Sequence, residues 1–162
     1  MGTDIKTWAV DADGNDITDR GKWGETYGWE HTHPFDWRSY AMFGWLADVR
    51  NYSDFKPIAK LRDLSEAPKW LSNDENGDWW DCSYGNSWVS VSELVKYDYD
   101  APVEDRRVTR RLPSGVLSGG CTCDDGDGEM TTMREVLGKE FFDNVEELVR
   151  IGANRVYFCF DC

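Results

Sequence analysis

Two cysteines one residue apart, Cys121 and Cys123, are followed by four carboxylates among glycines in the stretch GGCTCDDGDGE at 119–129. Thiolates bind zinc and carboxylates bind calcium in many proteins. A closed zinc site needs two further ligands, and the cysteine spacing here is shorter than in a zinc knuckle. The carboxylate spacing also differs from that of a twelve-residue EF-hand loop. We therefore expect a solvated acidic turn that binds no metal ion.

Arginine and aromatic side chains form a second candidate site with different chemistry. Arg38 and Arg50 flank a dense apolar segment. Trp37 and Tyr40 in this region could stack on a nucleobase while a guanidinium group holds a phosphate. The alternative is a core helix whose arginines extend along apolar surface to reach water.

The densest basic cluster is the stretch EDRRVTRR at 104–111. Guanidinium groups bind phosphate oxygens through paired hydrogen bonds, so this stretch is a candidate anion site. The alternative is a loop in which the arginines balance the preceding Glu104 and Asp105. The candidate residues in this stretch are Arg106, Arg107, Arg110 and Arg111.

Trp79 and Trp80 lie in a polar, turn-rich stretch where large rings either fold back onto the core or contact a ligand. His31 and His33 in HTHP would share one side of a strand, which suits a metal or a general base, but both also fit an exposed loop. The nucleophile-elbow, phosphate-loop, metalloprotease and dinucleotide motifs are absent. We therefore predict no catalytic residue and no cofactor, and we expect a binding protein.

The elements that must position these residues indicate a mixed α+β fold. DIKTWAV is typical of a strand, and Asp13 with Gly14 predicts a tight hairpin turn after it. Asp36 predicts the start of a deeply buried helix over 37–48. Residues 51–86 are rich in turn formers and predict a loop region.

Two capping boxes predict helices in the second half of the chain. Ser90 with Glu93 places a helix start near Val91, and Thr132 with Glu135 opens a C-terminal helical region that stops at Gly152. The final run RVYFCFDC predicts a buried strand beside the first one. The 162 residues fit a single compact domain, 1–162, with a small sheet of N- and C-terminal strands, two or three packed helices, and an insertion at 98–131 that is a candidate flexible segment.

The charge balance excludes several partners. Thirty-one acidic and 18 basic residues give a formal net charge of -13, which repels duplex nucleic acid and anionic membranes. No apolar run is long enough to span a bilayer, and the start MGTDIK lacks the features of a secretory signal, so we expect a cytoplasmic protein with reduced thiols. The many aromatic residues are compatible with homo-oligomer formation.

Several segments together resemble a family of small proteins encoded by tailed bacteriophages and by bacteria that carry related genes. The resemblance lies in MGTDIK, RSYAMFGWLADVRNY, PI at 57–58, SWVSVSEL and VYFCFD, and it spans the whole chain, with 98–131 the least similar part. The family pattern has cysteine and histidine where this chain has Thr3 and Lys6, and histidine in place of Asn86. Any metal chemistry that depends on those histidines would therefore be absent here.

The resemblance implies a phage accessory protein that acts against host defence in the host cell cytoplasm. We carry two hypotheses of different classes. The first is a non-catalytic protein that binds and sequesters a nucleotide-like immune signal between aromatic and arginine side chains. The second is an acidic inhibitor that docks directly on a host defence protein and imitates the charge of nucleic acid.

Overall fold

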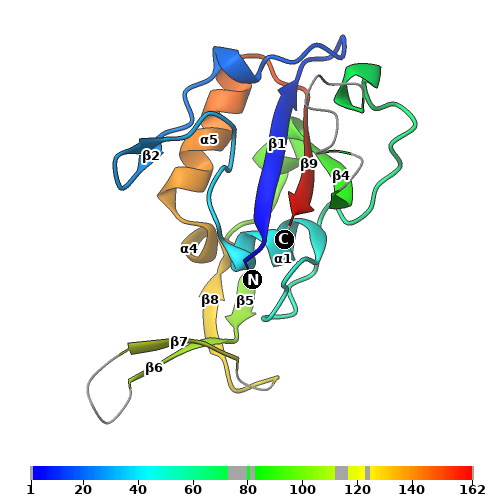
Figure 1. Ribbon diagram of the computed structural model, residues 1–162. Coiled ribbons are helices and arrows are strands. Elements are labelled where there is room, and N and C mark those ends of the chain that lie inside the picture. The colour runs from blue at the N-terminus through cyan, green and yellow to red at the C-terminus, as the bar shows by residue number, and fades with distance from the viewer. Residues whose placement is uncertain (1, 73–79, 81–82, 112–116, 123–124, 162) are drawn as a thin grey trace.

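A three-stranded antiparallel sheet forms the centre of the protein. The computed structural model describes residues 2–72, 80, 83–111, 117–122 and 125–161, with backbone only for 108–111 and 117–122. The sheet contains β1 (Asp4–Val10), β9 (Arg155–Asp161) and β4 (Tyr84–Ser90) in the order β1–β9–β4, as Figure 1 shows. The predicted pairing of the N- and C-terminal strands is confirmed, with Ile5 opposite Phe160.

Four helices and the inward side chains of the sheet build the main core. They are α1 (Tyr40–Ala47), α3 (Val91–Lys96), α4 (Met133–Leu137) and α5 (Lys139–Arg150). Together with the sheet they make a mixed α+β fold, as the sequence predicts. Short 3-10 helices at Thr18–Arg20 and Lys69–Leu71 lie in the connections.

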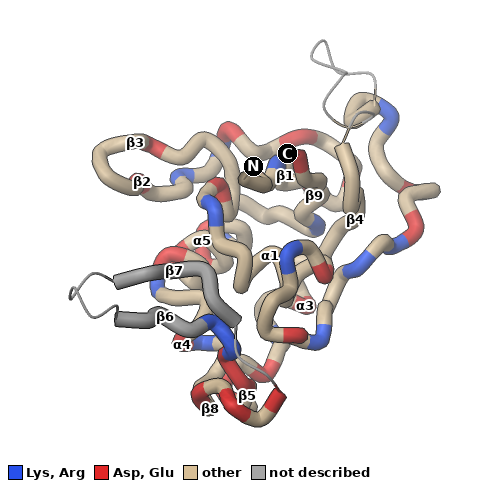
Figure 2. The backbone as a smooth tube through the Cα atoms, turned by 60° about the horizontal axis from the view of Figure 1, so that its bottom comes forward, with Lys and Arg blue, Asp and Glu red and all other residues tan. Residues whose placement is uncertain are grey.

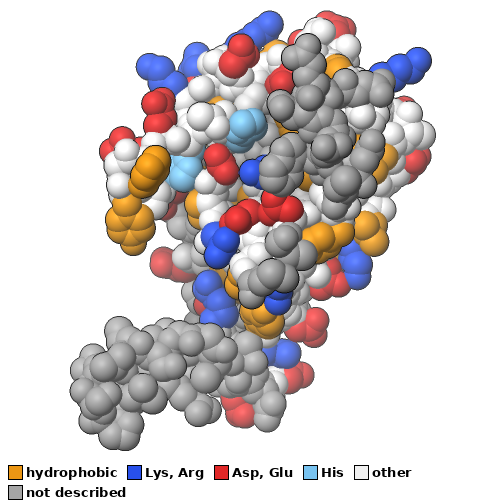
Figure 3. Space-filling model, in the orientation of Figure 1, with side chains coloured by type: hydrophobic (Ala, Val, Ile, Leu, Met, Phe, Trp, Pro, Cys, Tyr) orange, Lys and Arg blue, Asp and Glu red, His pale blue; other side chains and the backbone are white. Residues whose placement is uncertain are grey.

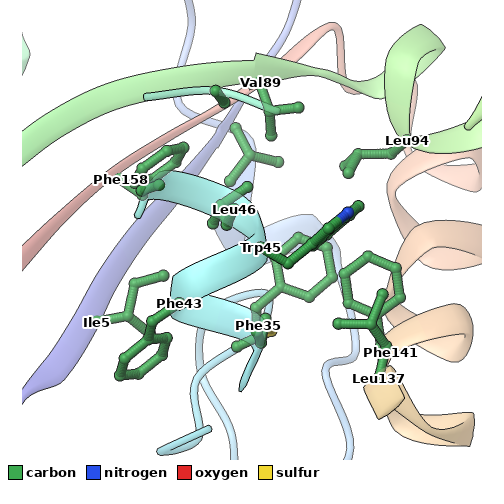
Figure 4. Packing of buried hydrophobic residues seen from close by; sticks show 14 of the residues in the cluster. Ile5, Phe35, Phe43, Trp45, Leu46, Val89, Leu94, Leu137, Phe141 and Phe158 are labelled. Carbon is green, nitrogen blue, oxygen red and sulfur yellow. The ribbon is translucent and has the colours of Figure 1, made fainter. Parts of the chain in front are cut away.

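Helix α1 is buried on every side, because residues 41–47 are all buried. Figure 4 shows Phe43 pointing toward Ile5 of β1, while Trp45 extends from the same helix toward Phe141 of α5. Phe141 in turn stacks on Phe35, with ring centroids 4.8 Å apart. Aromatic pairs of this kind contribute about 0.5–1.5 kcal/mol beyond the burial of their area. Helix α1 therefore joins the sheet to α5.

The opposite face of the sheet is covered mainly by residues between α1 and β4, which include the 3-10 helix Lys69–Leu71. Tyr157 and Cys159 of β9 point to this face, since their neighbours Val156, Phe158 and Phe160 point to the helices. The residues that cover them come mainly from the predicted loop region: Leu64, Ala67, Trp70, Leu71 and Trp80, packed with Trp8 and Trp88 from the sheet. Strand β9 is therefore buried on both of its faces.

An arm of paired strands extends from the body of the molecule. Strand β5 (Pro102–Asp105) pairs with β8 (Glu129–Thr132), and β6 (Arg107–Arg111) pairs with β7 (Leu117–Thr122) beyond them (Figure 1). Acidic residues lie at the end of β5 (Glu104 and Asp105) and at the start of β8 (Glu129), and Figure 2 shows negative charge in this region. This arm occupies most of the insertion predicted at 98–131.

The structure corrects several predicted boundaries. Helix α1 begins at Tyr40 and not at 37, because the Ser39 hydroxyl, rather than Asp36, caps it by accepting a hydrogen bond from the Met42 backbone. The predicted C-terminal helix is divided at Gly138, whose φ of 79° is a conformation that glycine adopts without strain.

The turn after the first strand also differs from the prediction. Only Gly14 has a positive φ there, and β1 meets the returning chain in a single bridge between Val10 and Asp16. The hairpin is therefore minimal, and β1 pairs with β9 instead.

Helix α3 begins with the predicted capping box. The Ser90 hydroxyl accepts a hydrogen bond from the Glu93 backbone, and the Glu93 carboxylate accepts one from the Ser90 backbone. Arg62 from the loop region donates two further hydrogen bonds of 2.6 and 2.7 Å to the same carboxylate. This ion pair lowers the pKa of Glu93 to about 2.

We predict that Glu93→Gln lowers the free energy of unfolding by about 1 kcal/mol at pH 7, a figure reduced for the 42% exposure of this side chain. A carboxyl group whose pKa is lowered on folding stabilises the protein above its unfolded pKa and loses that contribution as pH falls toward the folded value. Urea unfolding from pH 7 to pH 2 should therefore show the difference from wild type starting to shrink near pH 4.5 and becoming small only as pH approaches 2.

The matched control is Glu135→Gln, which changes the same helix position in α4. The Glu135 backbone N–H donates a hydrogen bond to the Thr132 hydroxyl, as Glu93 does to Ser90. Among the described residues, however, no cation forms an ion pair with the Glu135 carboxylate. A loss of stability in Glu93→Gln that is as large at pH 2 as at pH 7 would contradict a stabilising role for the ionised Glu93 carboxylate.

Candidate anion-binding site

Four hydroxyl groups and one guanidinium group meet beside the start of β1. The Thr3 hydroxyl accepts a hydrogen bond of 3.2 Å from Nε of Arg50 and lies 3.2 Å from the Tyr84 hydroxyl. The Thr3 backbone N–H donates to the Tyr40 hydroxyl, and the Arg50 guanidinium lies 3.4 Å from the hydroxyl of Tyr52. We call these five residues the Thr3 cluster.

Burial and exposure differ sharply within the Thr3 cluster. Thr3 is fully buried, whereas Arg50 is exposed and Tyr52 and Tyr84 are 46% and 40% exposed. The tyrosine rings of Tyr40 and Tyr52 meet edge to face with centroids 6.1 Å apart, and the Arg50 guanidinium lies 5.9 Å from the Tyr40 ring centroid. A fixed hydroxyl therefore anchors a cation that remains open to solvent.

Arg50 differs from most other arginines of the protein. Within the described part of the chain, no carboxylate lies within ion-pair distance of Arg50, and its guanidinium group contacts only neutral oxygens. Its positive charge is therefore available to an external anion. Seven other described arginines form ion pairs with carboxylates: Arg38, Arg62, Arg106, Arg107, Arg134, Arg150 and Arg155.

A tightly packed loop after α1 presents Arg50 and Tyr52. Asn51 holds this loop closed, since its side-chain amide donates to the Phe55 carbonyl and its side-chain oxygen accepts from the Phe55 backbone. A Cβ atom at Gly44 would come within 2.8 Å of the Asn51 Cα, so the loop reaches the helix only because residue 44 is glycine. Arg50 itself has a φ of 50°, a strained conformation for a non-glycine residue.

Arg38 lies near the Thr3 cluster but is already neutralised. Its guanidinium donates paired hydrogen bonds of 2.9 and 3.0 Å to the Asp4 carboxylate. This pairing lowers the pKa of Asp4 and raises that of Arg38. Arg38 therefore supports the start of β1 and contributes little net charge to an anion.

The structure places the remaining predicted ligand residues away from the Thr3 cluster. Trp37 packs partly buried against the main core beside Phe35, and Trp80 is 9% exposed in the cluster under the sheet. Arg106 is paired with Glu104 and Asp125, and Arg107 with Asp105, which matches the alternative of local charge balance. Trp79 and the side chains of Arg110 and Arg111 lie outside the described residues.

The histidines do not lie on a common strand as predicted. Strand β3 (Trp29–Glu30) ends before them, and each imidazole bonds a neighbouring threonine: His31 with Thr26 and His33 with Thr32. Among the described residues, no three histidine, cysteine or acidic side chains are placed to hold a metal ion. Cys159 is buried, and its desolvation raises the pKa of the thiol. Cys82, Cys123, Cys162 and the side chain of Cys121 lie outside the described residues.

Sequence reasoning missed three members of the Thr3 cluster: Thr3, Tyr52 and Tyr84. Thr3 is 81 residues from Tyr84 in the chain, so only the sheet brings them together. One signal was available, because Thr3 precedes the inward-facing series Ile5, Thr7 and Ala9 at the same two-residue spacing and is polar.

No family model, curated protein or solved structure matches this chain. The resemblance to small phage proteins therefore stays a prediction. Helices long and apolar enough to cross a membrane are not found among the described residues.

We predict that Gly44→Ala lowers the free energy of unfolding by about 1–3 kcal/mol, because its methyl group would overlap the Asn51 backbone. At a helix position with free space, replacing glycine by alanine would instead raise the free energy of unfolding by up to about 1 kcal/mol. The sign of the measured change in stability therefore tests the close contact between residue 44 and Asn51. Chemical denaturation of wild type and Gly44→Ala measures this change in the free energy of unfolding.

Gly2→Ala is the control for this substitution. The three heavy atoms nearest to its added methyl group all belong to the guanidinium group of Arg38, which is the far end of a long side chain. We expect only a small change in the free energy of unfolding for Gly2→Ala. If Gly44→Ala is more stable than wild type, the loop at Asn51 can move away from the helix and the prediction is wrong.

Proposed function

We propose that the protein binds a nucleotide-like anionic small molecule at the Thr3 cluster and sequesters it without chemical change. The observation that carries the proposal is the exposed Arg50 guanidinium, which is held by the buried Thr3 hydroxyl and has no carboxylate partner among the described residues. An arginine in this state binds a phosphate through charge-assisted hydrogen bonds.

The aromatic members of the Thr3 cluster fit the rest of such a ligand. Tyr52 and Tyr84 expose large parts of their rings beside Arg50, and their hydroxyls can donate or accept hydrogen bonds. Exposed aromatic faces stack on nucleobases, and this contact is worth about 1–3 kcal/mol per base in single-strand binding proteins. Phosphate and base recognition would then come from adjacent side chains.

The chemistry of the Thr3 cluster favours binding over catalysis. Hydroxyl and guanidinium groups keep their protons at neutral pH, so they act as hydrogen-bond donors rather than general bases. The carboxylate of Asp4, which follows Thr3 in the chain, is occupied by Arg38. A protein that holds a signalling nucleotide intact acts by lowering its free concentration, which is the role we propose in the setting of phage and host defence.

We predict that at least one compound in a panel of cyclic mononucleotides, cyclic dinucleotides and ADP-ribose derivatives raises the melting temperature and is recovered intact after denaturation. Selective binding to the folded state adds about 2.7 kcal/mol of stability at a hundredfold excess over Kd. Arg50→Gln should weaken calorimetric binding of that compound by roughly 10- to 100-fold, because a charge-assisted hydrogen bond contributes about 1.5–3 kcal/mol.

The matched control is Arg20→Gln, which removes an exposed arginine that also lacks a carboxylate partner among the described residues but belongs to no hydroxyl cluster. Binding in Arg20→Gln should equal wild type. No shift with any compound would contradict the proposal and favour direct docking on a host protein. A degraded compound would show that the protein is an enzyme.

A further inference from the structure

The hairpin formed by β2 (Glu25–Thr26) and β3 exposes two large aromatic side chains. Tyr27 is 98% exposed and Trp29 is 79% exposed. Figure 3 shows hydrophobic side chains projecting from the body at the position that the hairpin occupies in Figure 1. The seven other tryptophans that the structure describes all belong to or pack against a buried cluster: Trp8, Trp23, Trp37, Trp45, Trp70, Trp80 and Trp88.

The turn of this hairpin has a fixed and strained geometry. Tyr27 and Gly28 have φ values of 51° and 81°, and positive φ at both central positions is typical of the tight hairpin turn that glycine and asparagine favour. A bulky tyrosine at such a position is uncommon and costs energy. Tyr27 makes almost no contact with its own chain in return, so its placement has no explanation in folding.

The two glutamates of the hairpin place like charges opposite each other. Glu25 and Glu30 are paired directly across the two strands, and like charges in that arrangement destabilise a hairpin. Both residues are exposed, and in the part of the chain that the structure describes neither forms an ion pair. A cationic group placed between these carboxylates would relieve the repulsion.

A few contacts nevertheless hold the hairpin in place. The His31 backbone donates a 2.8 Å hydrogen bond to the Gly24 carbonyl, which extends the pairing by one step. The Thr26 hydroxyl lies 2.7 Å from the His31 ring, and Trp23 is buried just before the first strand. The aromatic tip is thus presented in a defined conformation, which lowers the entropy lost on binding.

We propose that this hairpin docks on a partner protein whose surface offers lysine or arginine side chains beside an apolar slot. Tyr27 and Trp29 would fill the slot, as tyrosine and tryptophan do at the centres of many interfaces. Glu25 and Glu30 would contact the basic side chains at the rim, where complementary charge increases the rate and selectivity of association. This surface is separate from the Thr3 cluster and does not depend on nucleotide binding.

The test uses the full chain with the photoreactive amino acid p-benzoylphenylalanine in place of Tyr27. After irradiation in a lysate of the cells that naturally produce the protein, the crosslinked peptide is sequenced and its protein is purified. We expect the crosslinked peptide to contain or adjoin lysine or arginine. Capture alone does not support the proposal, which requires the binding measurements below.

We expect Trp29→Ser and the double variant Glu25→Lys/Glu30→Lys each to weaken binding of the purified partner at least tenfold. The control Met130→Ser removes a side chain that is 68% exposed on β8, and it should bind like wild type, as should Arg50→Gln. Unchanged affinity in the charge-reversal variant, a crosslink to a second copy of this chain, a crosslink to a surface without basic residues, or no crosslinked protein would each overturn the proposal.

Discussion

The central strand β9 determines how the rest of the chain must fold. Its five residues Val156–Phe160 are all buried, with phenylalanine and valine on one face and Tyr157 and Cys159 on the other. A strand that is apolar on both faces requires cover on both, since an uncovered face would leave large aromatic area in water. The helices of the main core cover one face, and the described residues that cover the other come mainly from the segment that contains Trp70 and Trp80.

This constraint also explains where most of the aromatic residues go. From the sequence alone, Trp80 either folds back onto the core or contacts a ligand. In the structure it packs with Trp8, Trp70 and Trp88 in the second layer of the core. The run RVYFCF predicts a buried strand because it lacks polar alternation. It does not identify the covering segment, because the turn formers in residues 63–72 predict a loop, whereas Leu64, Ala67 and Leu71 pack in the same cluster as β9.

The sequence predicted well those features that depend on residues close together in the chain. The capping residues Ser90 and Thr132 mark the true helix starts, because a cap is decided within four residues. The Thr3 cluster was only partly predictable for the opposite reason. Arg50 and Tyr40 stand out by residue type, but their partners Thr3 and Tyr84 reach them through the pairing of β1 and β4 with β9.

The overall charge of the protein sets a condition on any anion at Arg50. A net charge of -13 repels anions at distances up to about a Debye length, roughly 8 Å at physiological salt. Binding must then come from short-range contacts, in which the guanidinium and the hydroxyls replace the water around a phosphate. Most arginines nearby in sequence or space are committed to carboxylates, as Arg38 is to Asp4, so they give little long-range attraction. An inorganic anion meets the same repulsion and gains nothing from the tyrosine rings. The site should therefore select a ligand that also stacks on those rings.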